Sequence, residues 1–347
     1  MEQEHKRRVR YKGTHPRRFE EKYKELNPEK YGEEVQKIMD SGKTPAGTHR
    51  SIMVQEILDV LQIKPGEIGL DATLGYGGHS RKMLEQLHGE GHLYATDVDP
   101  IESEKTRERL QKAGFGPEIL TIRRMNFARL DEVAPDVKFD FVLADLGVSS
   151  MQIDNPERGF SFKFEGPLDL RLDPSSGVSA AERLRELDED EIVAMLVENA
   201  DEPYAEKIAR AIVHAQKQQS IETTVQLASI IEGALSFLPQ KERKEEVKKA
   251  CQRCFQALRI DVNSEFEVLY AFLEKLPGVL KPGGRAAILT FHSGEDRLVK
   301  KAFKQHHQEG LYSEISQELI RPSAKECFQN PRAKSTKLRW AIRGEEG

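Results

Sequence analysis

Residues 66–79 decide the fold and read Gly66-Glu67-Ile68-Gly69-Leu70-Asp71-Ala72-Thr73-Leu74-Gly75-Tyr76-Gly77-Gly78-His79. The apolar centre of this stretch is short and flanked by glycine, which is typical of a buried strand in a parallel sheet. The glycines after it favour a tight turn into a helix, because glycine adopts dihedral angles closed to other residues and lets the backbone approach a ligand. The stretch therefore predicts a strand, a ligand-binding glycine loop and a helix. A turn with only a structural role is the alternative.

The spacing of the glycines narrows the class of ligand. A dinucleotide-binding loop requires the pattern G-x-G-x-x-G. Gly75 and Gly77 supply its first two glycines, but Ser80 stands at the third position. A glycine turn that misses this spacing suits a nucleoside ligand without a pyrophosphate, of which S-adenosylmethionine is the commonest. We therefore expect Gly75 to approach such a cofactor.

Outward from this stretch, short apolar runs alternate with helical patterns on both sides of a long interruption. This alternation predicts an α/β protein with a parallel sheet covered on both faces. The interruption itself contains amphipathic helical stretches and no strand pattern. The other candidate strands are HGEGHLYATDVD (88–99), ILTIRRMNF (119–127), KFDFVLADLG (138–147), RAAILTF (285–291) and LRWAIR (338–343).

The economical interpretation is one sheet domain with an all-helical insertion. The glycine loop precedes the insertion and the strand RAAILTF follows it, so both halves are needed to complete the sheet. We predict a basic polar extension at 1–46 and a helical substrate-recognition domain at 151–255. The sheet domain is predicted in two halves, at 47–150 and at 256–347.

Charge is unevenly distributed along the 347 residues. The net charge of −5 excludes a uniformly basic nucleic-acid binder, but seven basic and no acidic side chains occupy residues 5–18. A second basic cluster lies near the C-terminus. Local clusters on an acidic chain fit contacts with phosphates, with a solvated tail as the alternative for the first cluster. The second cluster comprises Arg321, Lys325, Arg332, Lys334, Lys337, Arg339 and Arg343.

The sequence carries no sign of a membrane or secreted protein. No apolar run approaches the length that spans a bilayer, and the N-terminus has no apolar stretch that could act as a signal, so we expect a cytoplasmic protein. Three cysteines argue against a disulfide framework. Cys251 and Cys254 form a single C-x-x-C without a second ligand pair, so we expect ordinary thiols and no metal.

Polar residues at the ends of the next strands complete a candidate site. Asp97 follows the second strand, where a carboxylate accepts hydrogen bonds from ribose hydroxyls. Asp99 competes for this role, although a helix cap with Pro100 at the first helical position is the preferred interpretation. Phe127 follows the third strand and either covers adenine or packs in the core.

Asp145, at the end of the fourth strand, is the candidate catalytic residue. A carboxylate there can accept a hydrogen bond from an exocyclic amine, orient it and help remove its proton. His292 and Arg297, after RAAILTF, are candidates for catalysis and substrate binding. Alternatively, Ser293 caps the next helix with Asp296 at its third position. Because a methyl sulfonium is already an activated donor, the reaction requires no metal.

A loop at the start of the insertion suggests how RNA would be held. Phe160 and Phe162 could stack on an unpaired base, and Arg171 could steer it, because RNA is often read through exposed single-stranded bases. The alternative is that these phenylalanines fill the junction between domains.

Taken together, these motifs resemble the ribosomal RNA small-subunit methyltransferase H family, also called MraW. The resemblance runs from about His49 to Arg343. It implies a class I, Rossmann-like methyltransferase fold with an inserted helical domain, S-adenosylmethionine as donor, and a cytidine of the 16S decoding region, methylated at N4, as target. The matching stretches are D-A-T-L-G-Y-G-G-H, A-D-L-G-V-S-S-x-Q, E-R-G-F-S-F, G-P-L-D-L-R-L-D, F-Q-A-L-R-I-x-V-N, G-G-R, F-H-S-x-E-D-R and N-P-R-A-x-S.

The resemblance also implies which residues contact the cofactor, namely Gly77, Gly78, His79, Asp97, Phe127, Asp145 and Gln152. The chain departs from the family pattern at Gly294, where leucine is usual, at Arg50-Ser51-Ile52, and in its basic extension. These departures bear on the RNA target more than on the donor site.

Other functions remain open from the sequence. The same fold could methylate another substrate, and the chain could be a non-catalytic ribosome assembly factor. A nicotinamide-dependent oxidoreductase is disfavoured by Ser80 at the third glycine position. The expected partner is 16S ribosomal RNA or the small subunit, and a homodimer is compatible with the sequence.

Overall fold

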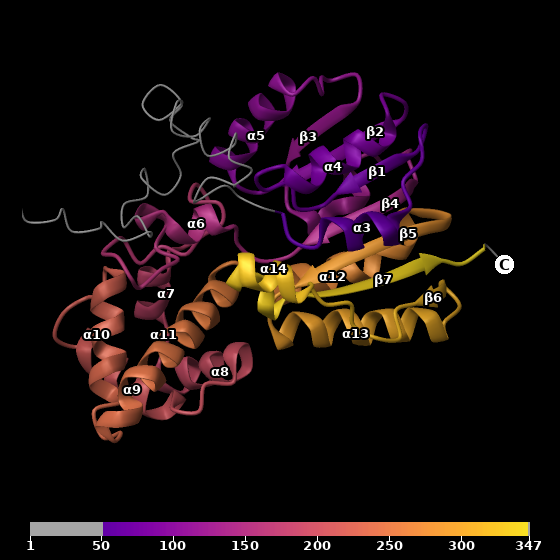
Figure 1. The fold of residues 1–347 in the computed structure, drawn as a ribbon. Coiled ribbons are helices and arrows are strands. Elements are labelled where there is room, and N and C mark those ends of the chain that lie inside the picture. The colour runs from indigo at the N-terminus through magenta and orange to yellow at the C-terminus, as the bar shows by residue number, and fades with distance from the viewer. Residues whose placement is uncertain (1–50, 346–347) are drawn as a thin grey trace, which may run out of the picture. The chain divides into compact units, whose positions relative to one another are not determined.

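The computed structural model describes residues 51–345 (Figure 1). The predicted extension 1–46 and its basic cluster lie outside the described residues. None of the helices in the described part is long and apolar enough to cross a bilayer.

A seven-stranded sheet forms the centre of the α/β part, in the order β3-β2-β1-β4-β5-β7-β6. The first five strands in that order are parallel, whereas β7 is antiparallel to β5 and β6 is antiparallel to β7. The strands are β1 (Ile68–Asp71), β2 (His92–Asp97), β3 (Leu120–Arg124), β4 (Phe139–Asp145), β5 (Leu280–Thr290), β6 (Tyr312–Ile315) and β7 (Lys337–Arg343).

The predicted α/β class is therefore confirmed, with two corrections. The sheet is not wholly parallel, because LRWAIR returns antiparallel to β5. The edge strand β6 was not predicted, since its sequence YSEI is short and has only one fully buried side chain.

Helices cover both faces of the sheet, and each face has its own apolar core. One core packs α12 and α13 against the sheet, and the other packs α3, α4 and α5 against the opposite face. These helices are α3 (Val54–Leu61), α4 (Gly78–Leu87), α5 (Pro100–Lys112), α12 (Glu265–Val279) and α13 (Ser293–Gln308), with the short η2 (Phe127–Glu132) after β3.

An all-helical segment lies between β4 and β5 and has a separate apolar core. Residues 150–262 are all described and contribute no strand to the sheet. The helix α11 continues past the predicted boundary at 255/256, so one helix runs out of the insertion toward the sheet domain. The elements are α6 (Ser150–Asp154), η3 (Pro156–Arg158), α7 (Ala180–Glu186), α8 (Glu189–Ala200), α9 (Ala205–Gln216), α10 (Thr224–Ala234) and α11 (Gln240–Val262).

Local sequence explains where several helices begin. Ser179 with Glu182, and Asp188 with Glu191, form the predicted capping boxes of α7 and α8. Each box satisfies backbone N–H groups that a helix start leaves without partners. Between β6 and β7 the chain forms α14 (Ala324–Gln329) and η4 (Pro331–Ser335). Because β7 begins beside the end of β5, with Thr290 opposite Lys337, this segment reaches the sheet edge where the parallel strands end.

Candidate active site

The glycine loop is held by a buried carboxylate at the end of β1. Asp71 is 1% exposed, accepts a hydrogen bond from Ser80 Oγ at 2.5 Å and another from the Thr73 backbone N–H at 3.1 Å. Burial raises the pKa of Asp71, against the opposing effect of the Ser80 bond. Ser80, which breaks the dinucleotide pattern, is therefore the residue that ties α4 to β1.

Asp97 lies beside the glycine loop at the end of β2. One carboxylate oxygen accepts from the Gly75 N–H at 2.7 Å and the other from the Asp99 N–H at 2.9 Å. Burial raises the pKa of Asp97 to about 6, although these backbone bonds favour the ionised form. Each oxygen keeps acceptor capacity for a further donor, so the group can bind hydroxyls when it is ionised.

The three loop glycines serve different purposes. Gly75 has φ +48°, and a Cβ there would lie 3.8 Å from the Thr73 carbonyl oxygen, an ordinary contact. At Gly77 a Cβ would lie 2.6 Å from Thr106 Cγ2, and at Gly78 it would lie 1.9 Å from Ser51 Oγ. Gly77 and Gly78 are thus needed for close packing, whereas at Gly75 the positive φ, and not a clash, favours glycine.

The decisive pair of the site joins residues distant in sequence. His79 Nδ1 lies 3.3 Å from Asp145 Oδ2, and His79 Nε2 lies 2.9 Å from the Ile52 carbonyl oxygen. Burial lowers the pKa of His79, but its bonds to Asp145 and Ile52 outweigh burial and raise it overall. The other oxygen, Asp145 Oδ1, is buried and has no hydrogen-bond partner in the described structure. A buried acceptor without a donor is costly, and Oδ1 could accept from a ligand N–H without displacing a protein donor.

Asp99 caps α5, as predicted, and also anchors the next element of the site. It accepts from the Ile101 and Glu102 N–H groups, with Pro100 at the first helical position. Its Oδ2 also accepts from Gln152 Nε2 at 2.9 Å and from Arg158 Nη1 at 2.7 Å.

Gln152 accepts in turn from the Ser149 N–H at 2.8 Å. The polar atoms of Gln152 therefore hold α6 against the start of α5. Its contact with a cofactor stays a prediction.

Phe127 lies after β3, and its ring packs edge-on against Phe272 with centroids 5.2 Å apart. The core-packing alternative thus accounts for this side chain, and a contact with adenine stays a prediction.

His292 caps α13 and faces the protein. Its Nδ1 accepts from the Glu295 N–H at 3.4 Å, while its Nε2 lies 3.2 Å from Glu295 Oε1. The alternative cap at Ser293 with Asp296 was wrong by one residue, because His292 and Glu295 form the box. Asp296 instead pairs with Arg339 Nε at 2.8 Å. These contacts assign His292 a structural role, and its role in catalysis stays a prediction.

Glu265, His292 and Glu295 bring possible ligand atoms within 4.8 Å of one another. Arg259 donates to both oxygens of Glu265, at 2.7 and 3.0 Å. The Arg259 guanidinium thus balances the charge of Glu265, one member of this group. Cys251 and Cys254 are free and buried, and burial raises the pKa of the Cys251 thiol to about 11.

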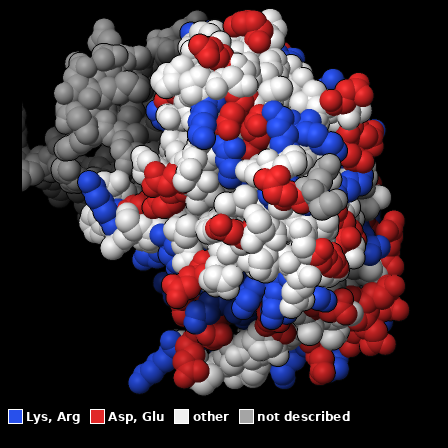
Figure 2. Space-filling view, turned by 90° about the vertical axis from the view of Figure 1, so that its right-hand side faces the viewer, with Lys and Arg blue, Asp and Glu red and all other residues white. Residues whose placement is uncertain are grey.

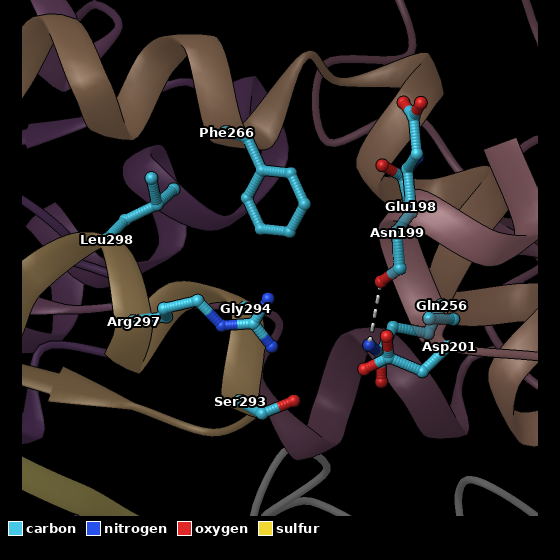
Figure 3. A pocket seen from close by; sticks show the side chains of 10 residues that line it. Glu198, Asn199, Asp201, Gln256, Phe266, Ser293, Gly294, Arg297 and Leu298 are labelled. Carbon is cyan, nitrogen blue, oxygen red and sulfur yellow. Dashed lines mark hydrogen bonds between the residues drawn. The ribbon is translucent and has the colours of Figure 1, made fainter. Parts of the chain in front are cut away.

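Arg297 lies on α13 beside a pocket of about 200 Å³ between α13 and the ends of α8 and α11. Figure 3 shows its guanidinium and the Phe266 ring reaching toward this pocket, with Asp201 on the opposite wall. At Gly294 a Cβ would lie 2.7 Å from the Phe266 ring, so glycine lets the ring lie over the start of α13. The position of Arg297 is compatible with the predicted contact to substrate.

The loop that follows η3 departs from expectation. Phe160 is only 8% exposed in the helical core, and Phe162 packs against Phe255 with centroids 5.5 Å apart. Both rings pack in the core of the helical insertion itself and not at a junction between domains, so the alternative is corrected. The burial of Phe160 counts against its stacking on a base, and a contact of Phe162 with substrate stays a prediction. Phe164, at 38% exposed, is the accessible ring of this loop. Arg171 is tied to Asp169 by two bonds.

Nearly the whole chain is similar to a known protein family. A model of the MraW methylase family matches residues 46–343. The chain belongs to the MraW methylase family. A relative from Agathobacter rectalis, named ribosomal RNA small subunit methyltransferase H 1, is 65% identical over 346 residues, with 99% of each chain covered. A relative of the same name from Lachnoclostridium phytofermentans is 64% identical, covering 98% of this chain and 93% of its own.

A less similar relative covers a smaller part of this chain. The ribosomal RNA small subunit methyltransferase H of Thioalkalivibrio sulfidiphilus is 42% identical, covering 87% of this chain and 99% of its own. The family model begins at residue 46, so most of the basic extension lies outside it. The predicted resemblance is therefore confirmed, and the chain is a methyltransferase.

Several residues of this MraW site were missed from the sequence. Thr73 Oγ1 accepts from the Asp145 N–H at 2.6 Å, and Thr106 Oγ donates to the Gly75 carbonyl at 2.6 Å. Arg158, 8% exposed, makes the buried ion pair with Asp99. Each partner is distant in sequence. Arg158 is the second residue of the motif E-R-G-F-S-F, and the motif does not indicate that its partner is Asp99.

Proposed function

We propose that this chain transfers the methyl group of S-adenosylmethionine to the exocyclic N4 amine of a cytidine in the decoding region of 16S ribosomal RNA. Methyl transfer follows from membership of the MraW family. Ribosomal RNA as substrate is supported by the names of the relatives. The N4 position is supported by the chemistry around Asp145.

The residues at the ends of β1 and β2 fit the donor. Asp97 would hold the ribose hydroxyls, because its carboxylate is bound to the glycine loop through the Gly75 N–H and both oxygens retain acceptor capacity. When bound there, S-adenosylmethionine supplies a methyl group already activated by the positive sulfonium. The protein then needs to position the acceptor and manage one proton.

Asp145 Oδ1 is the atom that we propose binds the cytosine amine, the acceptor of the methyl group. This buried oxygen has no donor in the described structure. It lies at the end of β4, whose neighbour β1 leads into the glycine loop and separates β4 from β2 and Asp97. The lone pair of a cytosine amine is delocalised into the ring, so the amine is a poor nucleophile. A hydrogen bond from the amine to Oδ1 would orient it and draw off its proton as the N–C bond forms.

His79 positions the Asp145 carboxylate. The contacts of His79 with Asp145 and Ile52 raise its pKa, and both ring nitrogens face acceptors, at 3.3 and 2.9 Å. The contact at 3.3 Å fixes the orientation of the Asp145 carboxylate. The Ile52 carbonyl holds the far side of the ring, so the pair presents Oδ1 in one direction.

The described surface supports local rather than general contact with RNA. Figure 2 shows Lys and Arg interspersed with Asp and Glu on the face that it presents, and no continuous basic surface on its described part. Of the C-terminal basic cluster, Lys337 and Arg339 pair with Asp296, and Arg343 donates to the Leu311 carbonyl. Arg332 pairs with Asp154 at 2.9 Å. Arg321, Lys325 and Lys334 form no ion pair within the described residues and are therefore the cations of the cluster that could meet phosphates.

The test uses isotopically labelled S-adenosylmethionine with naked 16S RNA and with small subunits lacking the modification. Digestion to nucleosides and mass spectrometry then locate the label. N4-methylcytidine is the expected product, and the better substrate identifies the partner as RNA or as the assembled subunit. Label in a different nucleoside would keep the donor site and overturn the target. Binding of the cofactor without transfer to either substrate would favour an assembly factor.

A further inference from the structure

Phe328 is the most exposed large apolar side chain of the described structure, at 88%. The others in that group range from 38% to 59%. A single exposed apolar residue is common on protein surfaces and by itself indicates nothing. The position of Phe328 near the candidate active site and the cations beside it suggest a function for its exposed ring.

The segment that carries Phe328 is fixed at the rim of the candidate active site. On α14 (yellow in Figure 1), Glu326 Oε1 accepts from the Met53 N–H at 2.8 Å. Met53 directly follows Ile52, whose carbonyl oxygen lies 2.9 Å from His79 Nε2. Arg332, on η4, donates to Asp154 at 2.9 Å at the end of α6. Both anchors thus join this segment to elements that carry site residues.

The free side of α14 is aromatic and basic. Lys325 and Phe328 are three positions apart, so they share one face of the helix. Lys325, Arg321 and Lys334 are exposed, and none forms an ion pair within the described residues. Glu326, the one acidic residue between 321 and 337, is turned to the protein by its bond to Met53.

We propose that Phe328 stacks on an unpaired base of the RNA substrate while Lys325, Arg321 and Lys334 contact the flanking phosphates. An exposed aromatic ring beside cations is the combination by which proteins hold single-stranded nucleic acid. The proposal rests on the proposed function only in taking RNA as the substrate. It does not depend on which nucleotide is methylated. The site would hold a base next to the target, outside the donor site.

Binding of a short fluorescein-labelled single-stranded RNA, with S-adenosylhomocysteine saturating, tests the proposal. Phe328→Ala should weaken binding by about 5- to 150-fold, the usual loss of one base–aromatic stack. The dependence of affinity on salt should stay unchanged, because no charge is lost. Lys325→Met should instead lower the salt slope by about 0.7, one phosphate contact on a single strand. Binding of the same RNA as a duplex should be indifferent to Phe328→Ala.

A matched control is present on α12. Tyr270 is 59% exposed, and Glu267 and Glu274 lie on its helix face at spacings of three and four residues. An acidic face repels phosphates, so Tyr270→Ala should leave RNA binding unchanged. Cofactor affinity and the melting temperature should match the parent in every variant, which separates lost stacking from lost structure.

Conservative replacements distinguish stacking from simple apolar contact. Phe328→Trp should retain affinity, whereas Phe328→Leu should lose it as alanine does. Parent-like affinity in Phe328→Ala, or full rescue by leucine, would overturn the proposal. Rescue by leucine would favour a protein partner on this face. If no methylated nucleoside forms while Phe328→Ala still weakens binding, the proposed reaction fails and the stacking site stands.

Discussion

Replacing Asp145 by asparagine should nearly abolish methyl transfer while leaving the fold intact. Asp145 Oδ2 lies 3.3 Å from His79, and Oδ1 has no donor in the described structure. Asparagine has almost the same shape but only one oxygen. If that oxygen faces His79, the NH2 group meets the substrate amine as donor against donor. In the opposite orientation the NH2 group faces His79 Nδ1.

The size of the effect follows from these two orientations. Neither can both hold His79 and accept from the substrate, so the proton-accepting contribution is lost. General base catalysis contributes about 10²- to 10⁴-fold, which corresponds to about 2.7–5.5 kcal/mol in the activation barrier. Cofactor affinity should fall much less than methyl transfer, because Asp97 and the glycine loop remain.

A single-turnover assay with enzyme in excess and labelled S-adenosylmethionine measures this step directly. Cofactor affinity by calorimetry and the melting temperature are measured on the same preparation. Asp131→Asn is the control, because it removes an exposed carboxylate paired only with Lys275 at 2.8 Å. Transfer by Asp145→Asn within about a factor of two of the parent, about 0.4 kcal/mol, would refute the assigned role.

Three further predictions follow from single contacts. Burial raises the pKa of Asp97 to about 6, and the carboxylate is the form that accepts from ribose hydroxyls. Cofactor affinity should therefore fall by up to about tenfold per pH unit below pH 6. Calorimetry should show this fall in the parent, whereas Asp97→Asn should bind weakly at every pH. Arg158→Met leaves Asp99 buried without its cation, so urea unfolding should show a loss of about 3 kcal/mol; an unchanged midpoint would contradict this. Gly233→Ala adds a Cβ with no neighbour within 4 Å inside α10, so thermal unfolding should show a gain of about 0.5–1 kcal/mol, and destabilisation would count against the described helix.

Features that depend on neighbouring residues were predictable from the sequence. The cap at Asp99 with Pro100, and the capping boxes of α7 and α8, involve residues three or fewer positions apart. The strand and glycine loop at 66–79 follow from a similarly short pattern. Such features form wherever the local chain favours them, so the sequence carries them directly.

Features that depend on packing between distant segments were not predictable in this way. His79 and Asp145 were each expected at the cofactor, but no sequence pattern joins a residue of α4 to one of β4. Phe160 looked accessible because its loop is rich in glycine and proline, yet the insertion buries the ring. The direction of β7 depends on a return across the sheet edge, which the pattern of LRWAIR does not encode.

The most direct measurement is a crystal structure of the chain with S-adenosylhomocysteine bound. The ribose hydroxyls should lie within hydrogen-bond distance of the Asp97 carboxylate, and the sulfur should lie at the carboxyl end of β4, with Asp145 Oδ1 facing the open space beside it. A ligand bound away from Asp97, or an Asp145 Oδ1 that is covered by a protein donor in that complex, would contradict this assignment of the donor site and of the acceptor's position.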